Sequence, residues 1–374
     1  MDAQEKQSLI TRELEEVLTQ EDLQALLAQA KPLKHYIGFE ISGEIHLGTG
    51  IAAMQKVKDL ADAGVQCTIF LADWHTWIND KLGGDRDAIK RIAAGYFKEG
   101  LSECYRVLGG NPDDLTVVLG SDLYRSNDAY WETVVGIAKH TTLNRAKRSI
   151  SILGRESNEE IDMAKMIYPI MQVADIFALD VQIAHAGMDQ RKAHVIARDV
   201  AKKINKEKPI ALHHHLLLGL GKPPIWPLSA DADKQELWAS LKMSKSKPES
   251  AVFITDEPEA IGEKVMQAFC PPKDQSAGEA GTDFNPIIDW AEHLVLPRQK
   301  EGIAIKREAS HGGDLTIANA DELKRIYQAG DLHPQDLKQF VADYLIAFLA
   351  PIRDHFSQGA PKEMLDDLKA LKKK

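Results

Sequence analysis

The 374-residue sequence predicts an α/β protein in which a Rossmann-like parallel sheet with a helical insertion is followed by a mostly α-helical domain. Strand-like and helix-like apolar patterns alternate along the first half of the chain, which is typical of a parallel sheet with helices on both faces. One mostly helical stretch, about residues 126–177, is too long for a single crossover helix and predicts an insertion. Strand-like segments nearly vanish after Glu257.

The individual elements follow from apolar spacing and from glycine and proline breaks. Helical spacing predicts a helix over residues 14–30, and a further helix should begin at about Thr49 after the buried strand HYIGFE (residues 35–40). Later strands are expected at residues 66–72, 115–120 and 181–187, so the insertion falls between the third and fourth strands. Later helices are expected at residues 86–108, 257–269, 319–327 and 334–356. We place the two domains at residues 1–250 and 251–374.

Composition excludes several classes of protein. The net charge of −10 argues against binding nucleic acid through bulk charge, although basic clusters lie at residues 145–155, 191–208 and 242–247 and at the C-terminus. With no long apolar run and no signal-like N-terminus, we expect a cytoplasmic protein without a membrane segment. Cys67, Cys104 and Cys270 are far apart and form no CxxC pair, so we expect packed thiols and no zinc site.

A first candidate phosphate-binding motif, SGEIHLGT, occupies residues 42–49. It follows a strand and opens a helix, which is where an open α/β sheet binds phosphates. Gly43 and Gly48 allow a ligand to approach the backbone, and His46 can donate to a phosphate oxygen. Taken alone the motif is weak, because a histidine at a helix start is more often a cap or a packed side chain.

A second motif, KMSKSKP at residues 242–248, is far more specific. Lys242 and Lys245 lie three residues apart beside small hydroxyl residues, and such a cationic loop can fold over a triphosphate. An exposed basic loop is the alternative. The full KMSKS string is rare, however, and it occurs about 200 residues after the first motif.

A third set of polar residues is expected on one helix face. Tyr168, Gln172 and Asp175 are spaced i, i+4 and i+7 among mostly apolar neighbours. Buried polar groups need partners, so this face predicts a bound polar ligand unless the backbone satisfies all three. The segment GMDQRK, residues 187–192, ends a strand and starts a helix at the ligand-binding edge of the sheet.

Together these motifs resemble class I aminoacyl-tRNA synthetases, and specifically the archaeal and eukaryotic tyrosyl-tRNA synthetases. The HxG segment at residues 46–48 and the KMSKS segment at residues 242–246 are similar to the HIGH and KMSKS motifs of the class. Tyr36 and the strings LADWH, YPIMQVAD, GMDQRKAH and LHPQDLK occur in the order and spacing of the tyrosyl family. The resemblance spans nearly the whole chain.

The resemblance implies a tyrosine–tRNA ligase that uses ATP, with roles for these residues. Tyr36 and Asp175 would hold the tyrosine hydroxyl, and Tyr168, Gln172 and Gln190 would hold its amino group. Catalysis by charge stabilisation would fall to His46, Lys242 and Lys245. The ATP-binding residues would be Gly48, Gly187, Asp189, Met243, Ser244 and Ser246. A phenol and a carboxylate at the floor of an apolar pocket, paired only by a substrate hydroxyl, would reject phenylalanine without editing, for which tyrosyl enzymes are the standard example.

The resemblance also implies partners. tRNA(Tyr) would meet Arg191 and Lys192 near the first acceptor-stem base pair, although a phosphate contact is an equal alternative. The helical domain would read the anticodon with His333 and Asp336, which could equally be a helix start with a favourable acidic first turn. Mg²⁺ should accompany ATP, held by phosphate oxygens and water with no dedicated protein site. We expect a homodimer joined through the insertion.

Two positions depart from the family pattern, and two other functions stay open. Thr49 replaces the second histidine of HIGH, and His311 stands where relatives often carry a stacking phenylalanine. His213, His214 and His215 resemble a metal cluster, but adjacent strand residues point to opposite faces, so a structural role is favoured. The alternatives are a tryptophanyl-tRNA synthetase, against which Tyr36 counts, and a non-catalytic tRNA-binding relative, against which the intact KMSKS lysines count.

Overall fold

The computed structural model describes residues 1–29, 31–153, 162–224, 226, 234–245, 247–272 and 280–371. The chain divides into two compact units. The sheet unit contains Met1–Gly43, Ala53–His215 and Gly359–Lys374, and the helical unit contains Glu44–Ala52 and Leu216–Gln358. The domain boundary near residue 250 remains a prediction.

A six-stranded sheet with the order β1-β6-β5-β2-β3-β4 forms the centre of the sheet unit. The predicted parallel sheet is confirmed with five parallel strands, of which β6 was not among the four strands expected, and the first strand pairs antiparallel with β6. The strands are β1 (Leu14–Leu18), β2 (Lys34–Phe39), β3 (Gln66–Leu71), β4 (Thr116–Leu119), β5 (Ile183–Gly187) and β6 (Ile210–His214). The sheet is therefore mixed, with an antiparallel strand at one edge.

The helix expected over residues 14–30 is wrong in its first part. β1 occupies Leu14–Leu18, and only Gln20–Leu27 is helical (α2). Glu16 of β1 lies opposite His213 of β6, so pairing with a strand almost 200 residues away overrides the local helical spacing. The Thr19 side chain caps α2 by accepting from the Asp22 N–H at 3.2 Å.

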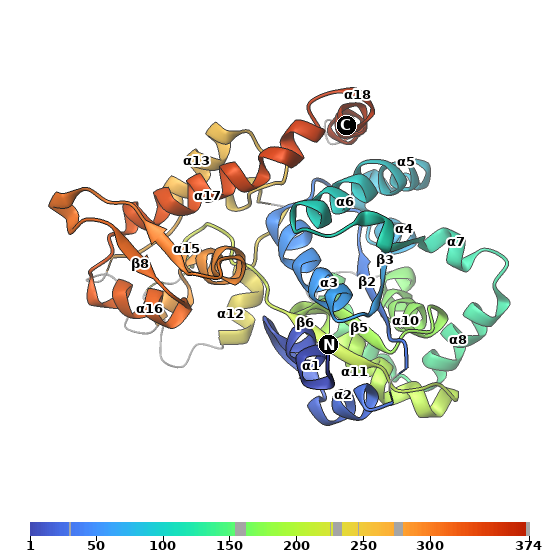
Figure 1. Cartoon of the computed structure of the whole chain (residues 1–374). Coiled ribbons are helices and arrows are strands. Elements are labelled where there is room, and N and C mark those ends of the chain that lie inside the picture. Colours follow the sequence, from blue (N-terminus) through green and yellow to red (C-terminus); the bar gives the residue numbers. More distant parts are fainter. Residues whose placement is uncertain are drawn as a thin grey trace. The chain divides into compact units, whose positions relative to one another are not determined.

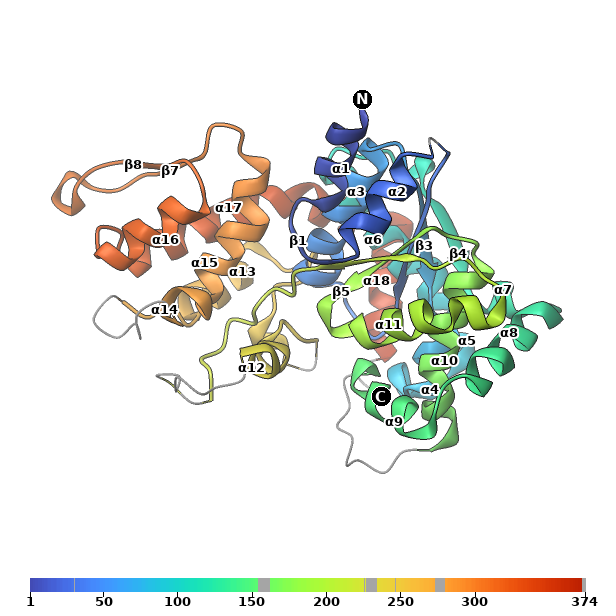
Figure 2. The ribbon, with the colours of Figure 1, turned by 90° about the horizontal axis from the view of Figure 1, so that it is seen from below.

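Helices cover both faces of the sheet, which leaves the carboxyl ends of the parallel strands open to ligands. Figures 1 and 2 show α3 (Ala53–Asp62) and α6 (Lys98–Val107) on one face and α10 (Met163–Ala178) and α11 (Arg191–Val200) on the other. The helix expected at residues 86–108 is confirmed as α5 and α6, which the π-helical turn η3 (Ala93–Phe97) joins. The helices are α1 (Ala3–Thr11), α3 (Ala53–Asp62), α4 (Asp73–Ile78), α5 (Arg86–Ile92), α6 (Lys98–Val107), α7 (Gly120–Tyr124), α11 (Arg191–Val200) and α18 (Gly359–Leu371).

The predicted helical insertion lies between β4 and β5. It contains α8 (Asp128–Lys139), α9 (Leu143–Ser149) and α10 (Met163–Ala178). Because β1 was not expected, these are the fourth and fifth strands of the chain rather than the third and fourth. The insertion carries most of the exposed large apolar side chains of the described residues, namely Trp131, Val135, Leu143, Met163 and Ile167.

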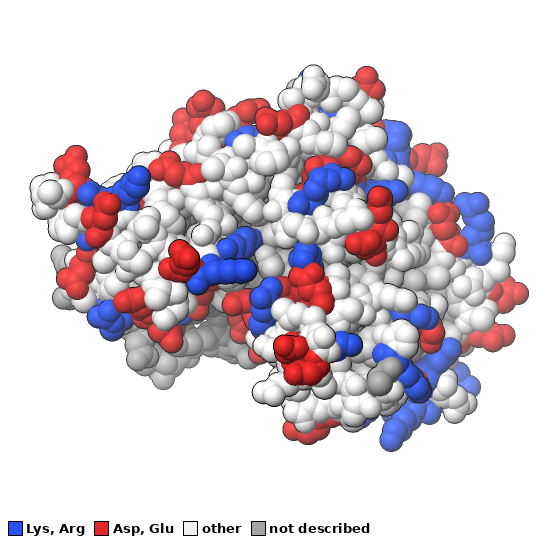
Figure 3. All heavy atoms as spheres, in the orientation of Figure 1, with Lys and Arg blue, Asp and Glu red and all other residues white. Residues whose placement is uncertain are grey.

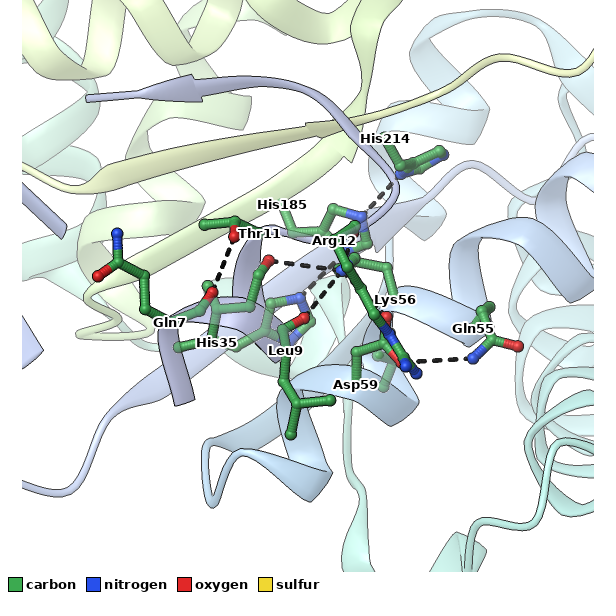
Figure 4. Close-up of polar contacts among 12 residues, drawn as sticks. Gln7, Leu9, Thr11, Arg12, His35, Gln55, Lys56, Asp59, His185 and His214 are labelled. Atoms are coloured by element: carbon green, nitrogen blue, oxygen red, sulfur yellow. Dashed lines mark hydrogen bonds and ion pairs between the residues drawn. The ribbon is translucent and has the colours of Figure 1, made fainter. Parts of the chain in front are cut away.

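A buried lysine connects the end of the N-terminal helix α1 to α3 within the sheet unit (Figure 4). Lys56 of α3 is 2% exposed, and its ammonium group donates to the carbonyl oxygens of Leu9 at 3.2 Å, Ile10 at 3.4 Å and Arg12. The same ammonium group lies 3.0 Å from the Asp59 carboxylate, which also pairs with Arg12. The lysine thus satisfies carbonyl groups that the end of α1 leaves unpaired.

Two histidine chains run through the sheet unit. His35 Nε2 lies 3.2 Å from His185 Nδ1, and His185 Nε2 lies 2.7 Å from His214 Nδ1 (Figure 4). On the opposite face of β6, His213 Nε2 lies 3.0 Å from His194 Nδ1. Burial lowers the pKa of His35 to about 3 and that of His214 to about 4, so these rings are neutral at pH 7. Adjacent histidines do point to opposite faces, as the strand period requires.

The helical unit is built around a long helix, α17, against which α13 packs (Figure 1). The helices expected at residues 257–269, 319–327 and 334–356 are confirmed. A small antiparallel hairpin of β7 and β8 was not predicted, because its strands are only three residues long. The elements are α12 (Lys234–Leu241), α13 (Pro258–Gln267), α14 (Ala280–Asp283), α15 (Pro286–Trp290), β7 (Ile303–Ile305), β8 (Leu315–Ile317), α16 (Ala320–Ala329) and α17 (Pro334–His355).

The cysteines, the helix lengths and the surface charge bear on the expectations drawn from composition. Cys67, Cys104 and Cys270 are free and buried, as predicted. None of the helices in the described part of the chain combines the length and the apolar character needed to cross a membrane. On the face drawn in Figure 3, basic and acidic side chains are interspersed.

Candidate functional site

Helix α10 presents the predicted polar face to the interior of the sheet unit. The Asp162 side chain caps this helix by accepting from the Lys165 N–H at 2.9 Å. Tyr168 and Asp175 are buried and Gln172 is partly buried. Tyr36 of β2 and Tyr168 belong to one apolar core cluster. The fold therefore collects these side chains in apolar surroundings, as the helical spacing indicated.

Two tyrosines that the sequence analysis did not identify hold Asp175. The hydroxyl groups of Tyr124 and Tyr130 donate to Asp175 Oδ1 at 2.9 Å and 3.0 Å. The expectation that only a substrate hydroxyl would pair the carboxylate is therefore wrong. Tyr124 ends α7 and Tyr130 lies in α8, and these helices bring the two phenols to Asp175 across separations of 51 and 45 residues in sequence.

The second oxygen of Asp175 remains available. Asp175 Oδ2 is buried and has no hydrogen-bond partner within the described residues, and His75 Nε2 lies 3.5 Å from it. Burial lowers the pKa of His75 to about 3, so the imidazole is neutral. Burial also raises the pKa of Asp175 to about 8, against the opposing effect of the two tyrosine donors.

Tyr36 lies within electrostatic range of Asp175. Burial, together with the Asp175 carboxylate, raises the pKa of Tyr36 well above its ordinary value. A β-carbon at Gly38 would lie only 2.8 Å from the Tyr36 hydroxyl oxygen, so glycine at that position makes room for the phenol. Tyr36 is thus a neutral hydrogen-bonding group beside a carboxyl group with one unpaired oxygen.

A second polar group forms further along the same face of α10. Gln172 Nε2 donates to Gln190 Oε1 at 3.2 Å, and Gln190 Nε2 donates to the Ile152 carbonyl oxygen at 3.0 Å. Gln172 Oε1 is buried and lacks a partner within the described residues. The Tyr168 hydroxyl donates to Glu40 at 3.3 Å. Gln172 Oε1 and the Glu40 carboxylate are therefore two acceptors to which an ammonium group could donate hydrogen bonds.

Glu40 is a functional candidate that the sequence analysis missed. Its carboxylate accepts from Asn79 Nδ2 at 3.0 and 3.2 Å, so both residues are held in place. The sequence could have identified Glu40 as a ligand-binding candidate, because it directly follows a buried strand and the carboxyl ends of parallel strands form the ligand-binding edge of the sheet. Glu40 was instead counted as the last residue of the strand HYIGFE.

The carboxyl end of β5 carries the GMDQRK segment as predicted. Gly187 ends the strand, Asp189 lies in the short 3₁₀ turn η6 (Met188–Gln190), and α11 begins at Arg191. The Asp189 carboxylate is partly buried and acts electrostatically on His214, opposing the burial that lowers the pKa of that imidazole. This carboxylate can accept hydrogen bonds from a hydroxyl-bearing ligand.

Two loops lie side by side within the helical unit. One contains His46, Leu47 and Gly48 (the HxG loop), and the other contains Lys242 and Lys245 (the lysine loop). The Leu47 N–H donates to the Val252 carbonyl at 3.0 Å, and the Ile254 N–H donates to the Ile45 carbonyl at 3.0 Å. Burial lowers the pKa of His46 well below its ordinary value, and Lys245 and Lys242 lower it further. Two segments about 200 residues apart thus bring a neutral imidazole and two ammonium groups into mutual range.

Thr49, the departure from the HIGH pattern, contacts His46 directly. Its backbone N–H donates to His46 Nδ1 at 3.3 Å, and its hydroxyl oxygen lies 3.3 Å from His46 Nε2. An acceptor at Nδ1 places the proton of the neutral ring on Nε2. Gly48 is also constrained, since a β-carbon there would lie 3.2 Å from the imidazole.

The remaining residues of the lysine loop differ in how far the structure defines them. The Met243 side chain is buried, and its N–H donates to the Leu217 carbonyl at 2.7 Å. The Ser244 carbonyl accepts from the Lys247 N–H at 3.2 Å. Ser246 lies outside the described residues.

The residues predicted to meet tRNA lie in two places. Arg191 pairs with the Glu16 carboxylate through Nε and Nη2, which is a side-on pair. Lys192 donates to the Arg148 carbonyl at 3.1 Å and to Ser151 Oγ at 2.8 Å. In the helical unit, His333 caps α17 through Nδ1, which accepts from the Gln335 N–H at 3.2 Å.

Asp336 follows in the first turn of α17. Its Oδ2 atom is buried without a hydrogen-bond partner among the described residues, and so can accept a bond from a ligand. The His311 side chain lies outside the described part of the structure.

Comparisons with known proteins identify the family to which this geometry belongs. A family model described as "tRNA synthetases class I (W and Y)" matches residues 28–350. The chain belongs to this class I synthetase family. The synthetase motifs at residues 42–49 and 242–248 both fall inside the matched region, so the expected fold class and enzyme class are confirmed.

Individual relatives extend the match over the whole synthetase. The present chain is 52% identical to the tyrosine–tRNA ligase of Thermococcus sibiricus over 368 residues, which is 96% of each chain. A crystal structure of the Pyrococcus horikoshii tyrosyl-tRNA synthetase complexed with L-tyrosine is 49% identical, covers 99% of this chain and 100% of that chain, and has a TM-score of 0.93. The tryptophanyl-tRNA synthetase of Aeropyrum pernix is 17% identical with a TM-score of 0.62, covering 95% of this chain and 85% of that one, and shares the fold.

Proposed function

We infer that this synthetase is a tyrosine–tRNA ligase, which activates L-tyrosine with ATP and transfers it to the 3′ end of tRNA(Tyr). The observation that supports this best is the buried Asp175 carboxyl, whose Oδ2 lacks a hydrogen-bond partner among the described residues, within range of the neutral phenol of Tyr36. Relatives about 50% identical over the full chain are tyrosine–tRNA ligases, whereas the tryptophanyl relative shares 17% of its residues. The tryptophanyl alternative is therefore not favoured.

Tyrosine recognition divides between the two ends of the substrate. We assign the phenolic hydroxyl to Asp175 and Tyr36, where the substrate hydroxyl would donate to Oδ2. Phenylalanine would leave the buried polar atoms unpaired, at a cost of about 1–3 kcal/mol for each group. We assign the substrate ammonium group to Tyr168, Gln172 and Gln190, with the unpaired Gln172 Oε1 as an acceptor.

We propose that ATP binds as its Mg²⁺ complex, in which phosphate oxygens and water would hold the metal. The ionised carboxylate of tyrosine attacks the α-phosphorus, pyrophosphate leaves, and tyrosyl-adenylate forms. No protein nucleophile and no general base are needed, because the attacking group is already deprotonated. His46 Nε2–H and the ammonium groups of Lys242 and Lys245 stabilise charge on the phosphate oxygens as the transition state forms.

Other groups position the nucleotide. We propose that Asp189 accepts hydrogen bonds from the ribose hydroxyls. The close backbone approach at Gly48 and Gly187 makes room for the nucleotide, and Met243, Ser244 and Ser246 complete the loop over it. In the second step a ribose hydroxyl at the 3′ end of the tRNA attacks the adenylate carbonyl, the tyrosyl group is transferred and AMP leaves.

We propose that the protein contacts the tRNA at its acceptor end and at its anticodon. Arg191 and Lys192 lie at the start of α11, where the acceptor end would approach. His333 and Asp336 at the start of α17 would read the anticodon, for which the unpaired Asp336 Oδ2 is a suitable acceptor from a guanine edge.

We further propose a cytoplasmic homodimer joined through the insertion. Val135, Leu143 and Met163 all belong to the insertion and are 60%, 71% and 72% exposed, and apolar side chains that gather into one exposed patch are typical of an interface between protein chains. Three free buried cysteines suit a reducing compartment.

One experiment tests the function. ATP–pyrophosphate exchange measured with each of the twenty amino acids should be driven by tyrosine and by no other. Exchange driven by tryptophan would support the tryptophanyl alternative, and no exchange with any amino acid would support a non-catalytic relative. Aminoacylation of tRNA(Tyr) then tests the second step.

A further inference from the structure

Glu16, in the middle of the edge strand β1, connects two elements that are distant in sequence. Its carboxylate accepts from Arg191 Nε at 2.8 Å (Oε2) and 3.0 Å (Oε1), and from Arg191 Nη2 at 2.8 Å (Oε1). The other side of the carboxylate meets His213, with Nδ1 2.9 Å from Oε2. Glu16 lies outside the motifs at residues 42–49, 168–175, 187–192 and 242–248.

Two neutral histidines, His213 and His194, form a chain of contacts on the buried side of the Glu16 carboxylate. Because burial lowers the pKa of His213, its ring is neutral and Nδ1 carries the proton donated to Glu16. His213 Nε2 is then an acceptor, 3.0 Å from His194 Nδ1, and the two rings are stacked with centroids 5.0 Å apart. His213 and His194 are both buried, so the Glu16 carboxylate is fixed on its inner side.

The pairing leaves one edge of the Arg191 guanidinium exposed. Nε and Nη2 face Glu16, while Nη1 makes no hydrogen bond to any described residue. The Arg191 side chain is 43% exposed, against 21% for Glu16. The edge formed by Nη1 and Nη2 is the one that grips two adjacent acceptors, such as two phosphate oxygens or the O6 and N7 atoms of guanine.

We propose that Glu16 is a positioning residue for tRNA, which holds the guanidinium of Arg191 so that its outer edge meets the acceptor end as a directional donor. This inference rests on the proposed function. An unheld arginine side chain has a large rotamer entropy to lose on binding, and the side-on pair with Glu16 fixes the guanidinium before tRNA arrives. The pair also offsets the arginine charge, which favours oriented binding over non-specific attraction.

Two other roles for Glu16 make different predictions. A carboxylate that merely repels RNA would predict tighter tRNA binding when its charge is removed. A carboxylate that merely fastens β1 to α11 would predict equal losses in adenylate formation and in tRNA charging. The positioning role predicts a selective loss in tRNA charging.

The test compares the full-length protein with Glu16→Gln, which keeps the length of the side chain and one acceptor oxygen. Tyrosine-dependent pyrophosphate exchange should stay within about twofold, while kcat/KM for tRNA(Tyr) should fall about tenfold, mainly through KM. Arg191→Lys, which keeps the charge and leaves β1 intact, should lose about as much. Glu21→Gln, at an exposed position of α2, is the matched control and should behave like the parent.

A double-mutant cycle decides whether Glu16 acts through Arg191. In an Arg191→Ala background, Glu16→Gln should cause no further loss. tRNA variants with a changed first base pair identify the contact: an effect that depends on the base pair indicates a guanine edge, and a uniform effect indicates phosphate. Unchanged or improved charging by Glu16→Gln, or an equal loss in exchange, would overturn the proposal. Absence of tyrosine-dependent exchange in the parent would instead overturn the proposed function.

Discussion

The Tyr124 hydroxyl donates a 2.9 Å hydrogen bond to Asp175 Oδ1, and both groups are buried. Tyr130 donates to the same oxygen, so Oδ1 is occupied and Oδ2 is the oxygen left for a ligand. The two phenols therefore act as a support that orients the carboxyl group. We expect this arrangement to govern how well a substrate hydroxyl is recognised.

Tyr124→Phe should weaken tyrosine recognition without removing the carboxyl group. Loss of one hydrogen-bond donor to the buried Asp175 carboxyl group costs about 1.4 kcal/mol, so kcat/KM for tyrosine in pyrophosphate exchange should fall about tenfold. Tyr105→Phe removes a hydroxyl elsewhere in the sheet unit and should leave exchange unchanged. An unaltered kcat/KM in Tyr124→Phe would show that Tyr130 alone orients Asp175.

The pKa of Asp175 predicts how stability depends on pH. Its value of about 8 in the folded protein lies above the ordinary value of about 4, so between these limits the folded state binds the proton more tightly. Stability should therefore decrease as pH rises, by about 1.4 kcal/mol between pH 7 and pH 9 from this group. Asp175→Asn removes this dependence. Urea denaturation of both proteins at the two pH values measures it, and parallel changes in both would refute the assignment.

Thr49→Val should slow adenylate formation. It removes the hydroxyl group that lies 3.3 Å from His46 Nε2 while it keeps the shape of the side chain. The loss of one hydrogen bond of about 1 kcal/mol predicts a kcat for exchange about fivefold lower. Thr49→Ser, which retains the hydroxyl, should keep most of the activity. If both variants lose activity equally, the methyl group of Thr49 rather than its hydroxyl matters.

Lys56→Met should destabilise the protein far more than an equivalent change at the surface. It leaves the carbonyl groups of Leu9 and Ile10 without this donor and removes one partner of the buried Asp59, at a cost of about 3 kcal/mol. Lys58→Met on the same helix breaks the surface pair with Asp62 and should cost under about 1 kcal/mol. Urea denaturation compares the two, and equal losses would contradict a structural role for the buried ammonium.

Val135→Glu on α8 should shift the proposed dimer toward monomer. A charge placed within an apolar interface loses its hydration without gaining a partner, which costs several kcal/mol across two symmetric copies. Sedimentation equilibrium at micromolar concentration measures the change. Ala370→Glu, at an exposed position of α18, is the control with the same change in charge. A parent protein that is already monomeric would refute the dimer.

The chemistry of this site was easier to predict than its supporting structure. His46, Lys242 and Asp175 occur in motifs whose spacing carries information, so their elements could be assigned from sequence. Tyr124 and Tyr130 occur in no such pattern, and they reach Asp175 only because the fold packs α8 against α10 and brings the end of α7 within hydrogen-bond distance of that carboxyl group. Residues that support a site across the fold depend on tertiary contacts that local spacing does not encode.

The N-terminal strand illustrates the same limit for the fold. Leu14 to Leu18 contains residues that favour helices, and its apolar spacing continues into α2. A strand forms because β6 offers an unpaired edge, which the local sequence cannot reveal. Longer strands such as β2 and β3 were predicted correctly, because buried apolar runs bounded by breaks are typical of parallel sheets.

β1 also closes the open side of β6. Shortened variants that lack residues through Leu18 would expose the backbone groups of Ile210–His214 to other molecules, and exposed strand edges promote aggregation. Loss of solubility in such variants would then precede any defect in substrate turnover, so insoluble material would say little about the reaction itself.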